Sequence, residues 1–366
     1  MRIGIDAHML GDRSGGNESF YSNILKQMQF AADDEAFLFV KNGIDVSAYE
    51  DRFQIVAFES KSPWVRYFIE LPRLCKKHRL DLLHTQYFVP FWRPCPVVCT
   101  IHDICFEYYK DIFTRREYTY QKLLIPYAAK HSKLIFTVSA NSKKDIITHY
   151  GLPEDRVVVT HNSVSDDFCR LTPEELDEAE LREKFGIGSG KFIVTVGNLQ
   201  PRKNLPRLIR AYLQLKKRFD GELKLVIVGK KAWMYDDILK EASKDSEGII
   251  LTDYVETRDL IRLYNAASCF VYPSFFEGFG IPPLEAMACG TPVAVANTTS
   301  LPEIVGEAGI YFDPFSEEDI ENCLERLLMD EALVKELKVK MNDQVKKFSW
   351  KESAAKIVES YRTLSE

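Results

Sequence analysis

Short apolar runs rich in Val, Ile and Leu alternate with amphipathic stretches along nearly the whole chain. Unbroken apolar runs of this kind are typical of strands buried on both faces of a parallel sheet. Their alternation with helical patterns predicts an α/β fold with an open, doubly wound sheet. In the first half we expect strands at 2–6, 36–40, 53–58, 82–84, 97–101, 134–138 and 157–160, and helices at 16–30, 64–78, 115–131 and 140–150.

The alternation stops at residues 165–190, which are charged, contain Pro173 and three glycines, and include one expected helix at 174–184. It then restarts. We expect strands at 192–196, 223–228, 249–251, 269–272 and 292–296, and helices at 205–219, 235–243, 257–266, 283–289, 316–329, 331–347 and 350–364. A chain of 366 residues has room for two domains. We expect a Rossmann-like domain at 1–165, a second one at 166–349, and a terminal segment, 350–366, that packs back on the first.

Charge and cysteine content indicate which partners and which cellular compartment suit this chain. The net charge of -6 argues against nucleic acid as a partner. Residues 1–165 carry 21 Lys/Arg and 19 Asp/Glu, so the first half is the more basic one. Eight scattered cysteines without a CxxC pair favour a reducing compartment.

The chain contains no apolar run long enough to span a bilayer, and its first residues run directly into an expected strand rather than a signal peptide. We therefore expect a cytoplasmic protein. Residues 64–79 and 108–133 mix aromatic and basic side chains, which suits peripheral contact of the N-terminal domain with the inner face of an anionic membrane. A solvated helix face explains the same pattern.

The strongest motif is Glu277-Gly-Phe-Gly-Ile-Pro-Pro-Leu-Glu285, which follows the expected strand 269–272. Gly278 and Gly280 let backbone amides approach a ligand closely. The Pro-Pro pair starts a helix whose N-terminus suits a diphosphate. We expect Glu285 in the first turn of this helix, where its carboxylate can bind two ribose hydroxyls, and Glu277 on the loop, where it can bind a sugar.

Two cations, Arg202 and Lys203, follow the first expected strand of the second domain. Arg can clamp a phosphate through two hydrogen bonds, and Lys acts as a point charge. Together they can neutralise a diphosphate leaving group. Taken alone, such a pair is more often part of a solvated surface.

In the first domain, His102 ends an apolar strand, so its ring is expected at the carboxyl edge of the sheet. A neutral imidazole can bond a sugar hydroxyl, and the neighbouring Asp103 can fix its tautomer. His84 and His161 are weaker candidates with ordinary structural explanations.

A glycine-rich loop at 11–18 follows the first strand but does not match G-x-G-x-x-G. The turn at Gly15 and Gly16 still lets backbone reach a phosphate at the start of a helix. A simple loop turn remains the alternative.

These motifs together resemble the E-x7-E signature and glycine loop of retaining glycosyltransferase family 4, and the similarity extends over essentially the whole chain. The resemblance implies a GT-B architecture, in which two Rossmann-like domains face a cleft. It implies that Glu277 contacts the donor sugar, that Glu285 binds the ribose, and that His102 lies at the donor sugar.

The resemblance also implies further donor contacts. Backbone at Phe279, Gly280 and Ile281 lies against the donor, and Tyr254 and Val255 line the base pocket. The glycine loop meets the donor phosphate and the acceptor, which makes Asp12 and Asn17 candidate acceptor contacts. The family often has an Arg where Asn198 stands here, so the phosphate role passes to Arg202 and Lys203.

The expected reaction is a retaining transfer of sugar from a nucleotide-diphosphate sugar to a glycan or lipid-linked saccharide, in surface-polysaccharide synthesis. No Asp-Xaa-Asp occurs, so we expect no metal, and we expect no cofactor. The resemblance is nearest to bacterial mannosyltransferases, which favours GDP-mannose; UDP-glucose and UDP-N-acetylglucosamine stay open. A nucleotide-sugar 2-epimerase and a non-catalytic sugar-nucleotide-binding protein are the alternatives.

Overall fold

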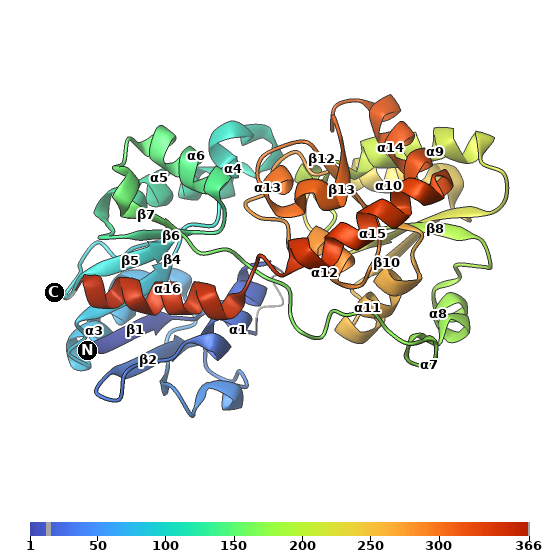
Figure 1. Cartoon of the computed structure of the whole chain (residues 1–366). Helices are drawn as coiled ribbons and strands as arrows, with labels where there is room; N and C mark the ends of the chain where they lie inside the picture. Colours follow the sequence, from blue (N-terminus) through green and yellow to red (C-terminus); the bar gives the residue numbers. More distant parts are fainter. Residues whose placement is uncertain (12–15, 365–366) are drawn as a thin grey trace. The chain divides into compact units, whose positions relative to one another are not determined.

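A computed structural model describes residues 1–11 and 16–364, with the backbone alone for Asn17. Its contacts divide the chain into two compact units (Figure 1). Unit 1 comprises Met1–Asn162 and Ser349–Glu366, and unit 2 comprises Ser163–Phe348. The sequence predicts boundaries at 165/166 and 349/350, and the contacts place the divisions at 162/163 and 348/349.

Unit 1 is built on a seven-stranded sheet in the order β3-β2-β1-β4-β5-β6-β7. The strands are β1 Arg2–Asp6, β2 Glu35–Val40, β3 Gln54–Ala57, β4 Leu82–Gln86, β5 Val97–Thr100, β6 Ile135–Thr137 and β7 Val157–Val159. Neighbouring strands pair in parallel. The strand order reverses between β1 and β4, which is where open α/β sheets leave a crevice at the carboxyl ends of their strands.

Helices cover both faces of this sheet. They are α1 Gly16–Gln27, α2 Pro63–Val65, α3 Leu71–Lys77, α4 Cys105–Tyr108, α5 Arg115–His131, α6 Ala140–Tyr150 and α16 Trp350–Thr363. The helix expected at 64–78 is interrupted by a π-helical turn, Arg66–Glu70. Helix α5 begins where expected because Thr114 and Glu117 form a reciprocal capping box.

The terminal helix α16 lies beside α1 in unit 1 (Figure 1). The side chain of Ser349 caps it by accepting a hydrogen bond from the backbone N–H of Glu352. The hydroxyl of Tyr361 lies 2.5 Å from His84 Nδ1, and both side chains are buried. Helix α16 is therefore part of the unit 1 core.

Unit 2 has a six-stranded sheet in the order β10-β9-β8-β11-β12-β13, again with parallel pairing. Its strands are β8 Lys191–Val196, β9 Leu223–Val228, β10 Ile249–Asp253, β11 Cys269–Tyr272, β12 Val293–Ala296 and β13 Gly309–Phe312. Its helices are α7 Pro173–Leu176, α8 Glu178–Phe185, α9 Leu205–Arg218, α10 Asp236–Ala242, α11 Thr257–Ala266, α12 Ile281–Ala288, α13 Leu301–Val305, α14 Glu317–Met329 and α15 Glu331–Val345. The order reverses between β8 and β11.

Unit 2 contains elements that differ from the expectation. The single helix predicted at 174–184 was wrong, because Asp177 adopts a left-handed conformation with φ 40° and separates α7 from α8. Strand β13 and helix α13 were not predicted.

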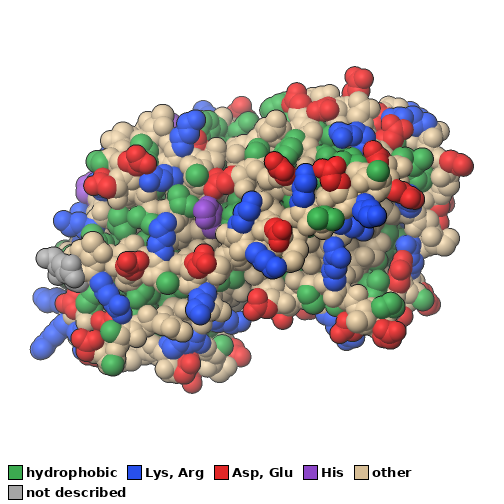
Figure 2. Space-filling view, viewed as in Figure 1, with side chains coloured by type: hydrophobic (Ala, Val, Ile, Leu, Met, Phe, Trp, Pro, Cys, Tyr) green, Lys and Arg blue, Asp and Glu red, His purple; other side chains and the backbone are tan. Residues whose placement is uncertain are grey.

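Acidic and basic side chains are interspersed on the face shown in Figure 2. Within the residues that the structure describes, no helix combines the length and the apolar character needed to cross a membrane.

Candidate active site

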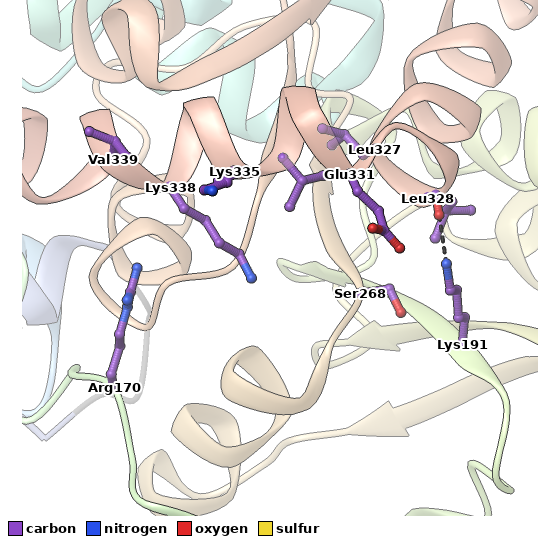
Figure 3. Close-up of a pocket in the computed structure, with 10 residues that line it drawn as sticks. Arg170, Lys191, Ser268, Leu327, Leu328, Glu331, Lys335, Lys338 and Val339 are labelled. Carbon is purple, nitrogen blue, oxygen red and sulfur yellow. Dashed lines mark hydrogen bonds between the residues drawn. The ribbon is translucent and has the colours of Figure 1, made fainter.

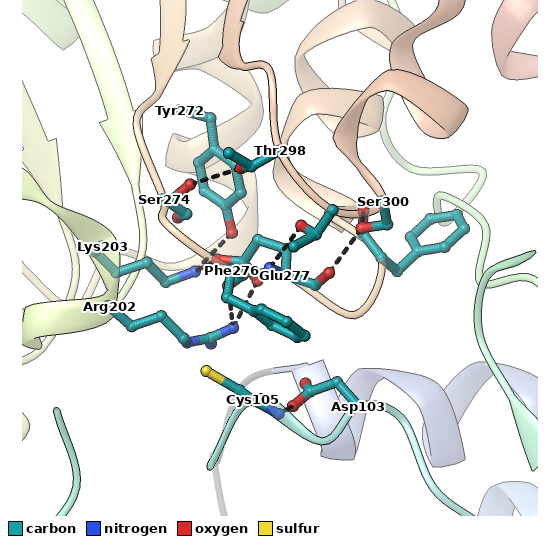
Figure 4. A network of polar contacts seen from close by, with 12 residues as sticks. Asp103, Cys105, Arg202, Lys203, Tyr272, Ser274, Phe276, Glu277, Thr298 and Ser300 are labelled. Atoms are coloured by element: carbon teal, nitrogen blue, oxygen red, sulfur yellow. Dashed lines mark hydrogen bonds and ion pairs between the residues drawn. The ribbon is translucent and has the colours of Figure 1, made fainter. Parts of the chain in front are cut away.

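The loops that follow β8 and β11 meet at the carboxyl edge of the unit 2 sheet, because these two strands are neighbours (Figure 4). Arg202 and Lys203 lie in a 3-10 turn, Pro201–Lys203, on the first loop. The backbone N–H of Phe275 donates to the carbonyl of Arg202 at 3.0 Å. Asn204 Nδ2 donates to the carbonyl of Pro273 at 3.1 Å. The two loops are therefore fastened to each other.

Glu277 joins the predicted cations in one cluster (Figure 4). Arg202 Nη1 lies 2.9 Å from Glu277 Oε2, and Lys203 Nζ lies 2.7 Å from Glu277 Oε1. Burial alone would raise the pKa of Glu277, but the two cations lower it to about 2. The carboxylate stays ionised at neutral pH, and two cations against one anion leave the cluster with excess positive charge.

Lys203 is buried, and its surroundings hold it in place. Its Nζ donates to the Tyr272 hydroxyl at 2.6 Å and lies 4.6 Å from the centre of the Tyr272 ring. A Cβ on Gly197 would lie 2.9 Å from Lys203 Cε, so the glycine makes room for the lysine stem. Tyr272 was not predicted as a site residue, although its place at the end of β11 could have indicated it.

Helix α12 carries the Pro-Pro pair, Pro282 and Pro283, in its first turn as predicted, and Gly290, which follows the C-cap residue Cys289, has φ 81°. The prediction that Glu285 lies in the first turn was wrong. The helix begins at Ile281, earlier than the 283 expected, so Glu285 falls in the second turn.

The surroundings of Glu285 differ from those of Glu277. Tyr264 donates a hydrogen bond to Glu285 Oε2 at 3.0 Å. Burial raises the pKa of Glu285 to about 7, and the Tyr264 hydrogen bond opposes that rise. The carboxyl group therefore titrates near neutral pH.

The loop Gly278–Ile281 is shaped by neighbouring side chains that the sequence did not indicate. The Ser300 hydroxyl lies 2.8 Å from the carbonyl oxygen of Glu277 and 2.7 Å from that of Phe279. The backbone N–H of Glu277 donates to Thr299 Oγ1 at 3.1 Å. Both hydroxyls follow β12, the strand beside β11, and that strand-end position is the signal that could have found them.

Gly280 has φ 107°, and a Cβ there would lie 2.7 Å from Leu301 Cδ2. The backbone therefore needs glycine at this position. Phe279 is buried with its ring against Phe348 at 5.4 Å. These contacts fix the path of the backbone into helix α12.

The predicted base-pocket residues follow β10 at the same edge of the sheet. Val255 is buried, whereas Tyr254 is exposed and lies under Lys230, whose Nζ is 4.6 Å from its ring centre. Lys230 follows β9 and was not predicted. The aromatic ring and the cation together offer a surface on which a planar base can stack.

In unit 1, His102 follows β5 and is buried. Burial lowers the pKa of His102 to about 3, so the ring is neutral. Its Nε2 is hydrogen-bonded to the side-chain amide of Gln86, at the end of β4. The expected partner, Asp103, instead accepts a hydrogen bond from the backbone N–H of Cys105 at 2.9 Å. Gln86 was missed because an amide at a strand end carries no distinctive pattern.

Gly16 is exposed and is the first residue of α1. Asp12, Gly15 and the side chain of Asn17 lie outside the described residues. His84 bonds Thr100 Oγ1 at 2.7 Å in addition to Tyr361, which confirms its structural explanation.

A recess of about 550 Å³ in unit 2 is lined by residues that include Lys191, the first residue of β8 (Figure 3). It therefore lies at the edge of the sheet opposite the carboxyl ends of the strands. Its lining includes Arg170, Lys191, Ser268, Glu331, Lys335 and Lys338. None of the predicted site residues lines it. Among the described residues there is no group of three or more His, Cys, Asp or Glu side chains that could hold a metal.

Two family models match the chain: Glycosyltransferase Family 4 at residues 31–168, and Glycosyl transferases group 1 at residues 177–348. O-antigen chain mannosyltransferase B of Escherichia coli is 35% identical over 276 residues, which cover 73% of this chain and 70% of the relative. The serotype-specific mannosyltransferase WbdA of the same organism is 31% identical over 282 residues, covering 74% of this chain. The alignment spans 34% of that longer relative.

Solved structures match the whole fold. A glycosyltransferase from Rickettsia africae superimposes with a TM-score of 0.77 at 19% identity, covering 100% of this chain and 98% of the other. Anabaena Alr3699/HepE in complex with UDP and glucose gives 0.76 at 17% identity, covering 99% and 100%. At such identities the likeness concerns the fold, and it agrees with the two parallel sheets.

Proposed function

Because this chain belongs to glycosyltransferase family 4 and is a glycosyltransferase of the GT-B fold, we propose that it transfers mannose from GDP-mannose to a glycan or lipid-linked saccharide, with retention of anomeric configuration and without a metal. The observation that carries the proposal is the cluster of Arg202, Lys203 and Glu277 at the carboxyl ends of β8 and β11. This is the position where open α/β sheets bind ligands.

In this proposal unit 2 binds the donor. Arg202 and Lys203 face the diphosphate with excess positive charge, together with backbone of Gly278–Ile281 and the N-terminus of α12. Glu285 binds ribose hydroxyls, and Glu277 binds a hydroxyl of the sugar while holding both cations in position. Tyr254 and Val255 flank the base, and Gly15 and Gly16 of unit 1 meet the phosphate.

The proposed step breaks the bond between the anomeric carbon and the diphosphate oxygen, and the electron pair passes to that oxygen. Arg202 and Lys203 stabilise the developing charge. The acceptor oxygen bonds the anomeric carbon from the same face, and its proton passes to the departing phosphate. The role proposed for His102, a hydrogen bond with a sugar hydroxyl, rests on the family resemblance and on its neutral ring.

Support for mannose comes from the names of the sequence relatives, which are O-antigen chain and serotype-specific mannosyltransferases. By extension from these relatives, we propose that the chain acts in the synthesis of a surface polysaccharide. Its acceptor is a saccharide or lipid-linked saccharide that Asp12 and Asn17 contact. The reaction takes place at the inner face of a membrane.

A thermal-shift comparison of GDP, UDP and ADP tests the donor. A nucleotide at about 100 times its dissociation constant adds about 2.7 kcal/mol to the free energy of unfolding. We expect GDP to raise the melting temperature most. A larger shift with UDP would contradict GDP-mannose as donor, and no shift with any of the three would contradict the donor site.

Incubation with GDP-mannose then tests the reaction. We expect a mannosylated acceptor with retained configuration, and equal rates with and without EDTA. An epimerised nucleotide sugar formed without acceptor would identify a 2-epimerase, and loss of activity in EDTA would overturn metal independence.

A further inference from the structure

Unit 1 exposes a continuous set of aromatic and aliphatic side chains, which we call the aromatic face. It comes from three segments: the turn that contains α2, the loop after β4, and the outer side of α5. Its most exposed members are Trp64 at 44%, Phe91 at 57%, Trp92 at 52% and Leu123 at 66%. Large apolar groups gathered at one surface mark a site of interaction.

Ring contacts join the three segments. Trp64 stacks on Phe68 at 5.6 Å, and Phe68 stacks on Phe91 at 4.7 Å. Phe91 meets Tyr127 of α5 edge-on at 5.0 Å, and Trp64 meets Tyr120 of α5 at 5.1 Å. The rings hold one another in position while their outer surfaces remain exposed, so the face is preformed.

Cations border this face. Arg116 Nε donates to the Tyr120 hydroxyl at 3.0 Å, and Arg93 donates to the Tyr127 hydroxyl. Residues 61–70, 91–93 and 115–131 contain seven cations, Lys61, Arg66, Arg93, Arg115, Arg116, Lys122 and Lys130, and two acids, Glu70 and Glu117. The Glu70 carboxylate accepts hydrogen bonds from the backbone N–H groups of Glu59 and Ser60. Glu117 belongs to the capping box of α5, and Lys122 pairs with Glu107. The border is strongly basic in a chain whose net charge is -6.

The face lies near the carboxyl edge of the unit 1 sheet. Phe88 and Phe91 follow β4. Phe88 contacts the ring of Tyr67, and the Tyr67 hydroxyl lies 2.8 Å from Nε2 of His8, just after β1. The aromatic face is thus connected to the strand ends where ligands of such sheets bind.

From this arrangement we propose that the aromatic face docks unit 1 on an anionic lipid bilayer. Trp and Tyr rings are suited to the interface between headgroups and acyl chains, and Arg and Lys side chains to lipid phosphates. Each feature alone binds a membrane weakly, but apolar burial and charge attraction add. The inference rests on the proposed function, since a lipid-linked acceptor would be presented at this surface.

A second copy of the chain fits the aromatic face less well than an anionic bilayer does. A two-fold contact through this face would place the same surface of both copies together. The basic border of one copy would then oppose that of its partner, and like charges facing each other disfavour association. Anionic lipid headgroups instead complement the border.

Co-sedimentation of the full chain with vesicles tests the proposal. We expect binding to phosphatidylcholine vesicles with about one third phosphatidylglycerol, and little to phosphatidylcholine alone. Raising salt from about 0.05 M to about 0.5 M should weaken binding, because it shortens the Debye length. No binding to anionic vesicles at low salt would overturn the proposal.

Variants test whether the aromatic face is the surface that binds. The double variant Phe91→Ser with Trp92→Ser should lower the partition coefficient onto anionic vesicles about tenfold. The double variant Arg115→Gln with Arg116→Gln should lower it about fivefold for each charge removed. Two matched controls lie on α15 of unit 2. One is the apolar substitution Val339→Ser, and the other is the double charge substitution Lys335→Gln with Lys338→Gln. Both should bind the vesicles as the unaltered chain does. Circular dichroism verifies folding.

An equal loss of vesicle binding in the α15 controls would overturn the assignment to this face. The assignment would also be overturned if light scattering shows that the unaltered chain is a dimer and that Phe91→Ser with Trp92→Ser dissociates it. Release of GDP from GDP-mannose, measured without vesicles, tests the proposed function separately. If no GDP is released but the chain still binds vesicles, the proposed function is contradicted and the docking surface is supported.

Discussion

Glu277 and Glu285 belong to one motif, yet their carboxyl groups have opposite surroundings. Two cations hold the pKa of Glu277 at about 2, whereas burial raises that of Glu285 to about 7. The first carboxylate pairs with Arg202 and Lys203, and the second accepts a hydrogen bond from the Tyr264 hydroxyl. Sequence spacing predicts both acids at one edge of the sheet but cannot predict this difference, because the partners come from other strands and helices.

Replacing Glu277 with Ala should destabilise the protein by about 3 kcal/mol, because it leaves the buried Lys203 without its counter-charge. Adding Lys203→Met should recover part of that loss, since the uncompensated charge is removed. Urea unfolding of both single variants and the double variant measures the coupling. Strictly additive losses would contradict an interaction between the two side chains.

Glu285 should make stability depend on pH. Its folded-state pKa, about 7, lies above the ordinary value of 4.5, so the folded state favours the protonated form. The resulting contribution of Glu285 to the free energy of unfolding is fully present below about pH 4.5 and is lost as pH rises through about 7. Glu285→Gln lacks it, and should be more stable than the unaltered chain at about pH 8 by on the order of 1–3 kcal/mol. Identical pH slopes for both chains in urea unfolding would contradict the raised pKa.

At the scale of elements, apolar strands and amphipathic helices could be predicted from the sequence. The bounds of α5, α6 and α11 agree with the expected ranges. The errors have local causes. Periodicity could not reveal the left-handed Asp177 that separates α7 from α8, nor the π-helical turn before α3. Strand β13 was missed because it begins with a glycine and lies at the edge of the sheet, where only alternate residues are fully buried, so its pattern is less distinct than that of the inner strands.

The entry into α12 gives a test at this scale. Gly280→Ala should cost about 2–3 kcal/mol, because alanine is strained at φ 107° and its Cβ would clash with Leu301. Gly221 has φ 105° with open space around it, so Gly221→Ala should cost only the backbone strain, about 1 kcal/mol. Thermal unfolding of the two variants compares them. Equal losses would mean that the contact with Leu301 does not matter.

At the scale of the molecule, the chain ends in the unit where it begins. Helix α16 follows unit 2 in sequence but packs on α1, and Tyr361 reaches the buried His84. Composition and periodicity predict two α/β domains. The order of strands then brings the Arg202–Lys203 loop and Glu277 together, since β8 and β11 are neighbours.

Tyr361→Phe should destabilise unit 1 by about 1–3 kcal/mol, because it leaves Nδ1 of a buried imidazole without its hydrogen bond. Donor affinity should not change, since the donor residues proposed in unit 2 keep their contacts. Thermal unfolding and calorimetric titration with GDP-mannose measure the two effects. A weaker donor affinity with unchanged stability would contradict this separation.

The central claim is that Arg202 and Lys203 stabilise the departing diphosphate during sugar transfer. It is tested most directly by the rate of mannose transfer from GDP-mannose to a lipid-linked saccharide acceptor. Lys203→Met should lower that rate by about 100-fold, the usual effect of losing one group that stabilises developing charge. Lys335→Met, an exposed lysine on α15, should transfer at the unaltered rate. A rate for Lys203→Met within about threefold of the unaltered enzyme would contradict the account.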